Sequence, residues 1–174
     1  MAKDKYPDSD LAEYVVETLA SKGVTLEGIA QAALEGQAKF NPDLKLIDSM
    51  MALRAVLRKR EALNSCAIAL ALDDMASKKL LPQPVQYIVE NDLPQYGVDE
   101  VLALKGMASI YGTVALMQTG YLDLNKVGVV KRLDESQHEY NVNTHIDDIV
   151  SALIAMTEAK LMHDHVEDES PQIN

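Results

Sequence analysis

Apolar residues recur at intervals of three to four along almost the whole chain, which is the spacing of amphipathic α-helices. Leu11, Val15 and Leu19 form the first such face, and Gly23 follows it as an end signal. The same pattern predicts further helices over about residues 25–39, 46–57, 61–79, 85–90, 99–120, 124–133 and 144–162. No stretch shows the strict alternation of a β-strand. We therefore expect an all-α fold, a single-domain multi-helix bundle over residues 1–162 with buried central helices, and an acidic disordered tail over residues 163–174.

Three of the expected helices are almost free of charge. Residues 62–72 and 149–157 contain no charged residue, and residues 101–122 contain only Lys105. A helix that is apolar on nearly every side belongs inside a protein. The most apolar window, residues 101–117, also holds polar residues and glycines, and it falls short of the ~20 strongly apolar residues that cross a bilayer. These helices are therefore expected at the centre of the bundle.

Each charge-poor helix adjoins an acidic doublet, namely Asp73-Asp74, Asp99-Glu100 or Asp147-Asp148. A carboxylate buried beside such a helix is costly unless a cation meets it. Carboxylate oxygens are the ligands that hard cations such as Mg²⁺ prefer. In an antiparallel bundle the end of one helix lies level with the start of the next, so the three doublets can meet at one end. The pattern indicates a site for Mg²⁺, or Mn²⁺, of the kind that handles phosphate.

The first two doublets also have a purely structural interpretation. Asp73-Asp74 lies near a helix C-terminus, where the macrodipole disfavours negative charge, and it could pair with Lys78 or Lys79 in a solvated last turn. Asp99-Glu100 opens a helix, where the macrodipole favours acids. That effect accounts for one acid more readily than for two.

The third doublet separates the two interpretations. Thr144-x-x-Asp147 has the spacing of a capping box, which would explain Asp147 without any ligand. Capping does not explain Asp148, because that residue shares a helix face with small side chains that suit an interior seam, namely Ser151, Ala152, Ala155 and Ala159. We therefore expect a functional role for Asp148.

Composition and charge exclude several classes of protein. A net charge of -11 argues against nucleic acid as a partner and against adhesion to anionic membranes. A single cysteine, Cys66, provides neither a disulfide framework nor a cysteine-based zinc site, and it is expected as a buried thiol. Residues 1–10 lack the apolar core of a signal peptide. The sequence indicates a cytoplasmic protein with at most peripheral membrane contact.

Among the basic residues, Lys59 and Arg60 are the candidates for binding phosphate. They flank the start of a charge-free helix, and arginine can bind phosphate through two hydrogen bonds. The chain contains no GxGxxG, P-loop or HExxH motif.

Two segments resemble the phosphatidylglycerophosphatase A family, and most closely its soluble branch in Gram-positive bacteria. One is YGVDEVLAL at residues 96–104, and the other is IDDIVSA at residues 146–152. Shorter matches are KRE at 59–61, ALDDMA at 71–76, KLLP at 79–82, IYG at 110–112 and GYLD at 120–123. The likeness covers roughly residues 46–160.

The resemblance implies a Mg²⁺-dependent hydrolase of phospholipid biosynthesis that removes the phosphate from phosphatidylglycerophosphate to give phosphatidylglycerol. Carried over by position, it implies metal ligation by Asp74, Asp99, Glu100, Asp147 and Asp148. Glu100, Asp147 and Asp148 are the expected catalytic residues, with the general base in the Asp147-Asp148 pair. Two features of membrane-bound members, transmembrane helices and a Gly-Thr-rich N-terminal motif, have no counterpart here.

Other functions stay open at this point. The substrate could be a soluble phosphomonoester, since the chain has no membrane anchor of the family's kind. A helical nucleotide pyrophosphatase also uses acidic helices and Mg²⁺, but its usual Glu-Glu-x-x-Glu run is absent. A non-catalytic helical interaction protein could retain the same acids. A homo-oligomer is compatible with so much apolar helix, although no interface can be located from the sequence.

Overall fold

The computed structural model describes residues 6–126, 128–136 and 141–169 of the chain. Within them the fold is all-α and forms a single domain without strands, as predicted. The helices are α1 (Asp8–Ser21), α2 (Leu26–Gln37), α3 (Leu46–Leu57), α4 (Arg60–Ser77), α5 (Val85–Glu90), α6 (Val101–Leu104), the 3₁₀ helix η1 (Ala108–Tyr111), α7 (Gly112–Asn125), α8 (Val129–Glu135) and α9 (Ile146–Glu169).

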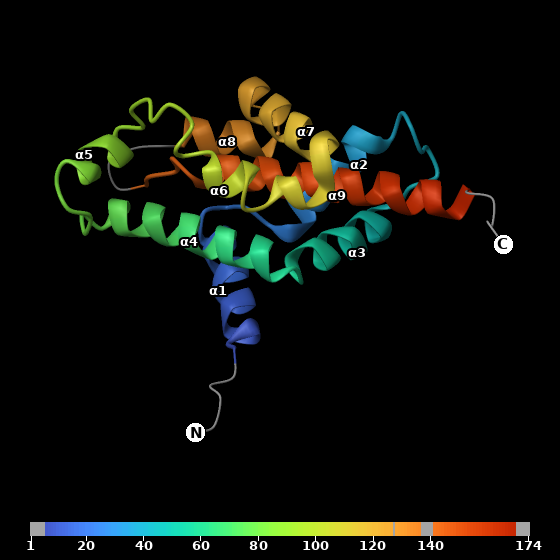
Figure 1. Ribbon diagram of the computed structural model, residues 1–174, viewed down its shortest axis with the longest axis horizontal. Coiled ribbons are helices and arrows are strands. Elements are labelled where there is room, and N and C mark those ends of the chain that lie inside the picture. The colour runs from blue at the N-terminus through green and yellow to red at the C-terminus, as the bar shows by residue number, and fades with distance from the viewer. Residues whose placement is uncertain (1–5, 127, 137–140, 170–174) are drawn as a thin grey trace.

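Helix α9 is the centre of the bundle. In Figure 1 it runs across the molecule, with α7 and α8 above it in this view and α3 and α4 below, and α2 also packs against it. Every residue from 142 to 159 is buried, so no face of that part of the helix meets water. This burial explains why residues 149–157 carry no charge, and it places the acidic start of α9 inside the protein.

The expected helix over residues 99–120 is wrong in its extent. The chain forms α6, turns, continues as η1 and starts again as α7 at Gly112, whose φ of +75° interrupts helical geometry. Gly120 does not end α7, which continues to Asn125 because a glycine inside a helix is only mildly unfavourable. The actual break lies at Lys126, which has a left-handed φ of 46°. The helix expected over residues 124–133 is therefore α8.

The ends of the chain also differ from expectation. Helix α1 begins at Asp8 with Pro7 in the capping position, two or three residues before the expected cap at Ser9 or Asp10. The cap at the start of α2 is confirmed, since Thr25 Oγ1 accepts a hydrogen bond from the Gly28 amide at 3.0 Å. Helix α9 continues to Glu169, so residues 163–169 of the expected disordered tail are helical. Residues 170–174 lie outside the described residues.

The segment Val101–Asn125 is apolar but largely uncovered by the rest of the protein. By length and composition alone it could cross a membrane, since its mean hydropathy is 1.2. Only 22% of the residues in its most apolar 18-residue stretch are buried. It is not one continuous helix, because it is broken between α6 and η1 and again at Gly112. The outer face of α7 consequently presents apolar side chains to the surroundings.

Gly106 allows α6 to lie close to α4, and Gly106→Ala is expected to destabilise the fold. An added Cβ would overlap with Ser65 Oγ and with the backbone oxygen of Leu102. Overpacking of this kind costs about 1–3 kcal/mol. The matched control is Gly120→Ala, because nothing lies within 4 Å of a Cβ at that position. Urea denaturation should show a lower free energy of unfolding for Gly106→Ala only, and equal stability of the two variants would contradict the close packing.

Candidate active site

Asp73 caps the start of α9 although it belongs to the last turn of α4. Its carboxylate is fully buried and accepts the backbone N–H of His145 at 3.1 Å and of Ile146 at 2.9 Å. The first N–H groups of a helix have no partner within it, and a negative charge there is favoured by the macrodipole. Asp73 therefore supplies the cap that α9 does not obtain from its own sequence.

His145 is held in place by the same carboxylate. Its Nδ1 lies 2.7 Å from Asp73 Oδ1, and the residue is buried. Burial lowers the pKa of the imidazole, but the hydrogen bond and the negative charges of Asp73, Asp99 and Asp147 outweigh it and raise the pKa above its usual value. The surrounding acids thus favour the protonated form of the His145 imidazole. Asp73 contacts Nδ1, so Nε2 is the ring nitrogen left for another partner.

Asp147 lies in the first turn of α9 and pairs with Lys126. Its Oδ2 is 2.6 Å from Lys126 Nζ, and its Oδ1 accepts the Asp148 amide at 3.0 Å. Burial raises the pKa of Asp147 to about 6, against the opposing effect of Lys126. The capping box that the sequence left open for Asp147 is not formed, because the Asp147 oxygens accept from Lys126 and the Asp148 amide, and the Thr144 hydroxyl donates to the backbone oxygen of Val89 at 2.7 Å.

Asp148 is the carboxylate with the most unfavourable surroundings. It is buried, and burial together with the negative charges of Asp147, Asp123, Glu100 and Asp99 raises its pKa to about 9. A metal-free protein at neutral pH therefore holds this carboxyl group protonated. The side chains that repel Asp148 come from α7, α9 and the segment before α6, so three parts of the chain meet here.

Asp99 and Glu100 complete this group directly before α6. A hydrogen bond with the Asp99 carboxyl, and then burial, raise the pKa of Glu100. Asp99 Oδ1 and Glu100 Oε2 are buried and have no hydrogen-bond partner in the described residues. Buried carboxylate oxygens without donors are costly and point to a missing cation or proton.

We use the term acidic cluster for the residues Asp99, Glu100, Asp123, Asp147 and Asp148. Lys126 is the cation in contact with it, with Nζ 2.7 Å from Asp123 Oδ1 as well as close to Asp147. Burial lowers the pKa of Lys126, but its hydrogen bonds with Asp123 and Asp147 raise it overall. The left-handed conformation at Lys126 ends α7 and turns this residue back toward the cluster.

The acidic cluster has the oxygen ligands that a hard cation prefers, but its side chains are not arranged around a common point. As the side chains stand, no three His, Cys, Asp or Glu residues of the described ranges lie close enough together to hold a metal ion. Lys126 pairs with two of the five carboxyl groups, and two oxygens of the others have no hydrogen-bond partner among the described residues. An excess of oxygen ligands of this kind suits Mg²⁺. Binding would require Lys126 and the carboxylates to shift.

Three of the residues expected in the site lie elsewhere. Asp74 points away from the cluster and pairs with Lys78 at 2.7 Å, with 43% of its side chain exposed. Arg60 forms a two-pronged ion pair with Asp8, at 2.7 and 2.8 Å, at the opposite end of α4. Lys59 lies over the ring of Tyr111. Because a helix rises 1.5 Å per residue, Lys59 and Arg60 are roughly 20 Å from Asp73.

The structure therefore gives no support for phosphate binding by Lys59 and Arg60 at the acidic cluster. The positive groups that do lie there, Lys126 and His145, were not singled out from the sequence. Asp123 was also missed as a site residue, although it ends the GYLD match, which was the available signal.

Residues 23–163 match the family described as Phosphatidylglycerophosphatase A. The uncharacterized protein YpjQ of Bacillus subtilis (strain 168) is 39% identical over 170 residues, which are 97% of this chain and 94% of YpjQ. The uncharacterized protein YutG of the same organism is 38% identical over 146 residues, which are 83% of this chain and 86% of YutG.

Solved structures agree with these matches. The crystal structure of YpjQ has a TM-score of 0.85 at 39% identity and covers 95% of this chain and 100% of that chain. The low temperature requirement C protein from Listeria monocytogenes has a TM-score of 0.84 at 36% identity and covers 91% of this chain and 98% of that chain. With a family match over most of its length and relatives of this similarity, the chain belongs to the phosphatidylglycerophosphatase A family.

Proposed function

We propose that this protein is a Mg²⁺-dependent phosphatase that removes the terminal phosphate from phosphatidylglycerophosphate to give phosphatidylglycerol. Its family is one of phosphatases, and the proposal adds the metal and the lipid substrate. The observation that carries it is the acidic cluster around Asp148, an excess of buried carboxyl groups at the start of α9. Such an excess is unfavourable for stability alone and fits a site that binds a cation together with phosphate.

Asp99, Glu100, Asp147 and Asp148 would hold the metal, with Asp123 as a further carboxylate at the same place. Bound Mg²⁺ would supply charge neutralisation for the phosphate and a lower pKa for a water nucleophile. Asp74, whose partner is Lys78, is not included in this ligand set.

The chain's own residues would handle the protons. The attacking water gives a proton to a carboxylate oxygen of the Asp147-Asp148 pair that the metal does not bind, as the water oxygen bonds to phosphorus. The bond from phosphorus to the glycerol oxygen then breaks, and that oxygen needs a proton. His145 is suited to donate it from Nε2, because Asp73 holds Nδ1 and favours the positive form of the ring. Lys126, which pairs with Asp123 and Asp147, would offset part of the negative charge around the site.

Mg²⁺ dependence is the first test of this proposal. Inorganic phosphate released by the purified protein should require Mg²⁺ or Mn²⁺ and should disappear when EDTA is in excess. Activity that is fully retained in EDTA would rule out the metal. No phosphate release from any phosphoester, with the protein folded, would favour a non-catalytic interaction protein.

The substrate needs a separate comparison. Phosphatidylglycerophosphate in mixed micelles should be cleaved far better than glycerol 3-phosphate, which carries the same phosphomonoester without acyl chains. A preference for glycerol 3-phosphate would instead assign a soluble substrate to the same site.

A further inference from the structure

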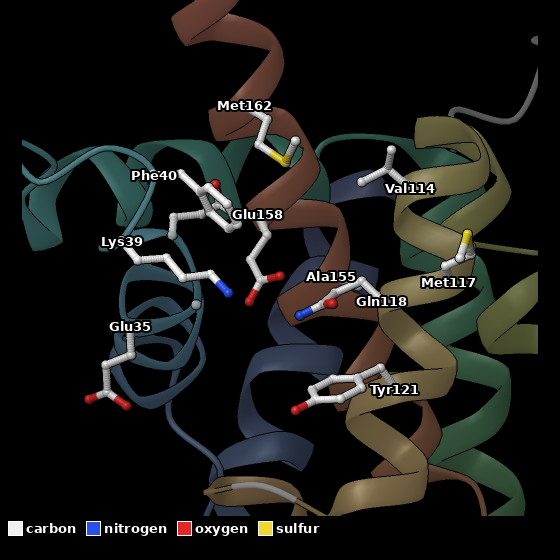
Figure 2. Close-up of a pocket in the computed structure, with 12 residues that line it drawn as sticks. Glu35, Lys39, Phe40, Val114, Met117, Gln118, Tyr121, Ala155, Glu158 and Met162 are labelled. Atoms are coloured by element: carbon white, nitrogen blue, oxygen red, sulfur yellow. The ribbon is translucent and has the colours of Figure 1, made fainter.

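A cavity separate from the acidic cluster lies between α2, α7 and α9. Its volume is about 780 Å³, within the range of roughly 300–1,000 Å³ typical of ligand sites. Figure 2 shows α9 as its floor, with α7 on one side and the end of α2 on the other. Half of its twelve lining residues are apolar or aromatic, namely Phe40, Val114, Met117, Tyr121, Ala155 and Met162.

The rim of this cavity is unusually apolar for a surface. Phe40 is 65% exposed, Met117 72% and Tyr121 57%. Val114, Met117 and Tyr121 follow one another at helical spacing along the outer face of α7, and Leu124, 83% exposed, continues that row. Contiguous exposed apolar side chains mark a surface that another apolar body covers.

Glu158 is the charged group on the cavity floor, and the fold provides space for it. It is only 4% exposed, and a Cβ at Gly36 would overlap with its Oε1. Burial raises the pKa of Glu158 to about 7, although a hydrogen bond with Gln118 and the charge of Lys39 oppose this. Figure 2 shows the Lys39 side chain extending toward Glu158. The cavity floor can therefore be neutral near physiological pH.

The cavity and the acidic cluster share two helices. On α9, residues Asp148, Ser151, Ala155, Glu158 and Met162 succeed one another at spacings of three and four, so they form one row along the helix. Asp148 and Ala155 are about 10 Å apart along it. On α7, Tyr121 lines the cavity and Asp123 belongs to the cluster. The cavity and the acidic cluster are therefore separated by a distance shorter than one molecule that carries a phosphate at one end and a long apolar body at the other.

We propose that this cavity is the binding site for a hydrocarbon chain of the lipid phosphomonoester whose phosphate lies at the acidic cluster. The inference rests on the proposed function for the identity of the phosphate end, but the chain site itself can be tested without turnover. A hydrocarbon chain matches the apolar lining, and the exposed row on α7 would face the rest of the lipid surface. A second copy of this protein on the same row is the competing occupant.

Direct binding of a fluorescent single-chain fatty-acyl probe to the full-length protein in EDTA tests the site independently of catalysis. Met117→Glu should weaken probe binding at least about tenfold, because it brings a charge to the apolar rim. Met117 is largely exposed, so this variant should fold. Ile68→Glu is the matched control, since Ile68 is an exposed apolar residue, 52% exposed, on α4. Equal binding by wild type, Met117→Glu and Ile68→Glu would overturn the proposal.

Probe binding should also depend on pH through Glu158. The neutral carboxyl group tolerates a hydrocarbon neighbour and the ionised one does not, so affinity should fall by about tenfold from pH 6 to pH 8. The other titratable side chains that line the cavity are Glu35, Lys39 and Tyr121. Glu158→Gln should bind the probe without this pH dependence. A pH dependence that persists in Glu158→Gln would contradict the assignment.

Two outcomes separate this inference from the proposed function. Probe binding that requires Met117 while phosphate release is absent would leave the chain site intact and reject the phosphatase. If Met117→Glu releases phosphate from phosphatidylglycerophosphate with the same KM as the wild type, the chain site is rejected and the phosphatase is left intact. The proposal would also be overturned if the wild type bound no probe and sedimented as a dimer that Met117→Glu dissociates. The exposed row on α7 would then be the contact with a second copy of the protein.

Discussion

Asp148→Asn is expected to lower phosphate release by at least about 10³-fold while leaving the metal-free protein as stable as the wild type, or more stable. The activity is lost because the change removes a carboxylate from the proposed Mg²⁺ site. The stability is kept because Asp148 is buried among Asp99, Glu100, Asp123 and Asp147, which repel its negative charge. Asparagine has the same size and never ionises.

The pH dependence of stability follows from the same carboxyl group. Its pKa is about 9 in the folded protein, against about 3.9 for an ordinary aspartate in an unfolded chain. The folded state therefore binds a proton that the unfolded state has lost, and stability in EDTA should fall as the pH rises from about 4 to 9. Asp148→Asn should flatten this slope.

Urea denaturation at pH 5, 7 and 9, with EDTA or with Mg²⁺, measures both effects. Asp147→Asn is the comparison, because Asp147 is paired with Lys126 and accepts the Asp148 amide. Loss of an acid at this helix N-terminus should cost about 0.5–2 kcal/mol in EDTA, and more with Mg²⁺, because Asp147 is also a proposed ligand. An Asp148→Asn protein that is destabilised equally in both conditions would show that Asp148 is structural.

Asp73→Asn is expected to have the largest effect on stability, a loss of about 3–5 kcal/mol. The buried carboxylate accepts from two backbone amides at the start of α9 and from His145 Nδ1. The asparagine amide offers one oxygen to these three donors and turns an N–H₂ group toward the others. The start of α9 then loses its cap, and His145 loses its charged partner.

The matched control for this change is the adjacent Asp74→Asn. Asp74 forms an exposed ion pair with Lys78 four residues along the helix, which is worth about 0.3–0.5 kcal/mol. Chemical denaturation of the two variants should therefore separate them clearly. Similar losses for both would contradict the cap assigned to Asp73.

The interaction of Asp73 with His145 also has a pH signature. Because the pKa of His145 is raised in the folded protein, its stabilising contribution is complete below the ordinary value of about 6.5. That contribution is lost as the pH rises through the folded pKa. Asp73→Asn should remove this loss from the stability profile.

The sequence predicts the regular parts of the fold because their signals are local. Helical spacing places α3 and α5 at their observed ranges, and the charge-free stretch of α9 predicts its burial. The break inside residues 99–120 was missed because it depends on the left-handed Gly112 and on the approach of Gly106 to Ser65. That approach joins residues distant along the chain, which periodicity does not report.

The acidic cluster was predictable only in part for the same reason. Charge-poor helices beside acidic doublets identified Asp99, Glu100, Asp147 and Asp148, and the structure brings these four together. Adjacent residues of a helix point about 100° apart, and only the position of α9 decides that Asp73 faces inward and Asp74 outward. Lys126 is turned toward the cluster by its left-handed backbone conformation, which no sequence pattern predicted.

The most direct test of the Mg²⁺ site is the thermal unfolding of wild type and Asp148→Asn as Mg²⁺ is added. Mg²⁺ at 100 times its dissociation constant should stabilise the wild type by roughly 2.7 kcal/mol. The rise in Tm should be much smaller for Asp148→Asn, because it lacks one of the carboxylates that hold the ion. An unchanged Tm for the wild type, or an equal rise for both proteins, would contradict a Mg²⁺ site at the acidic cluster.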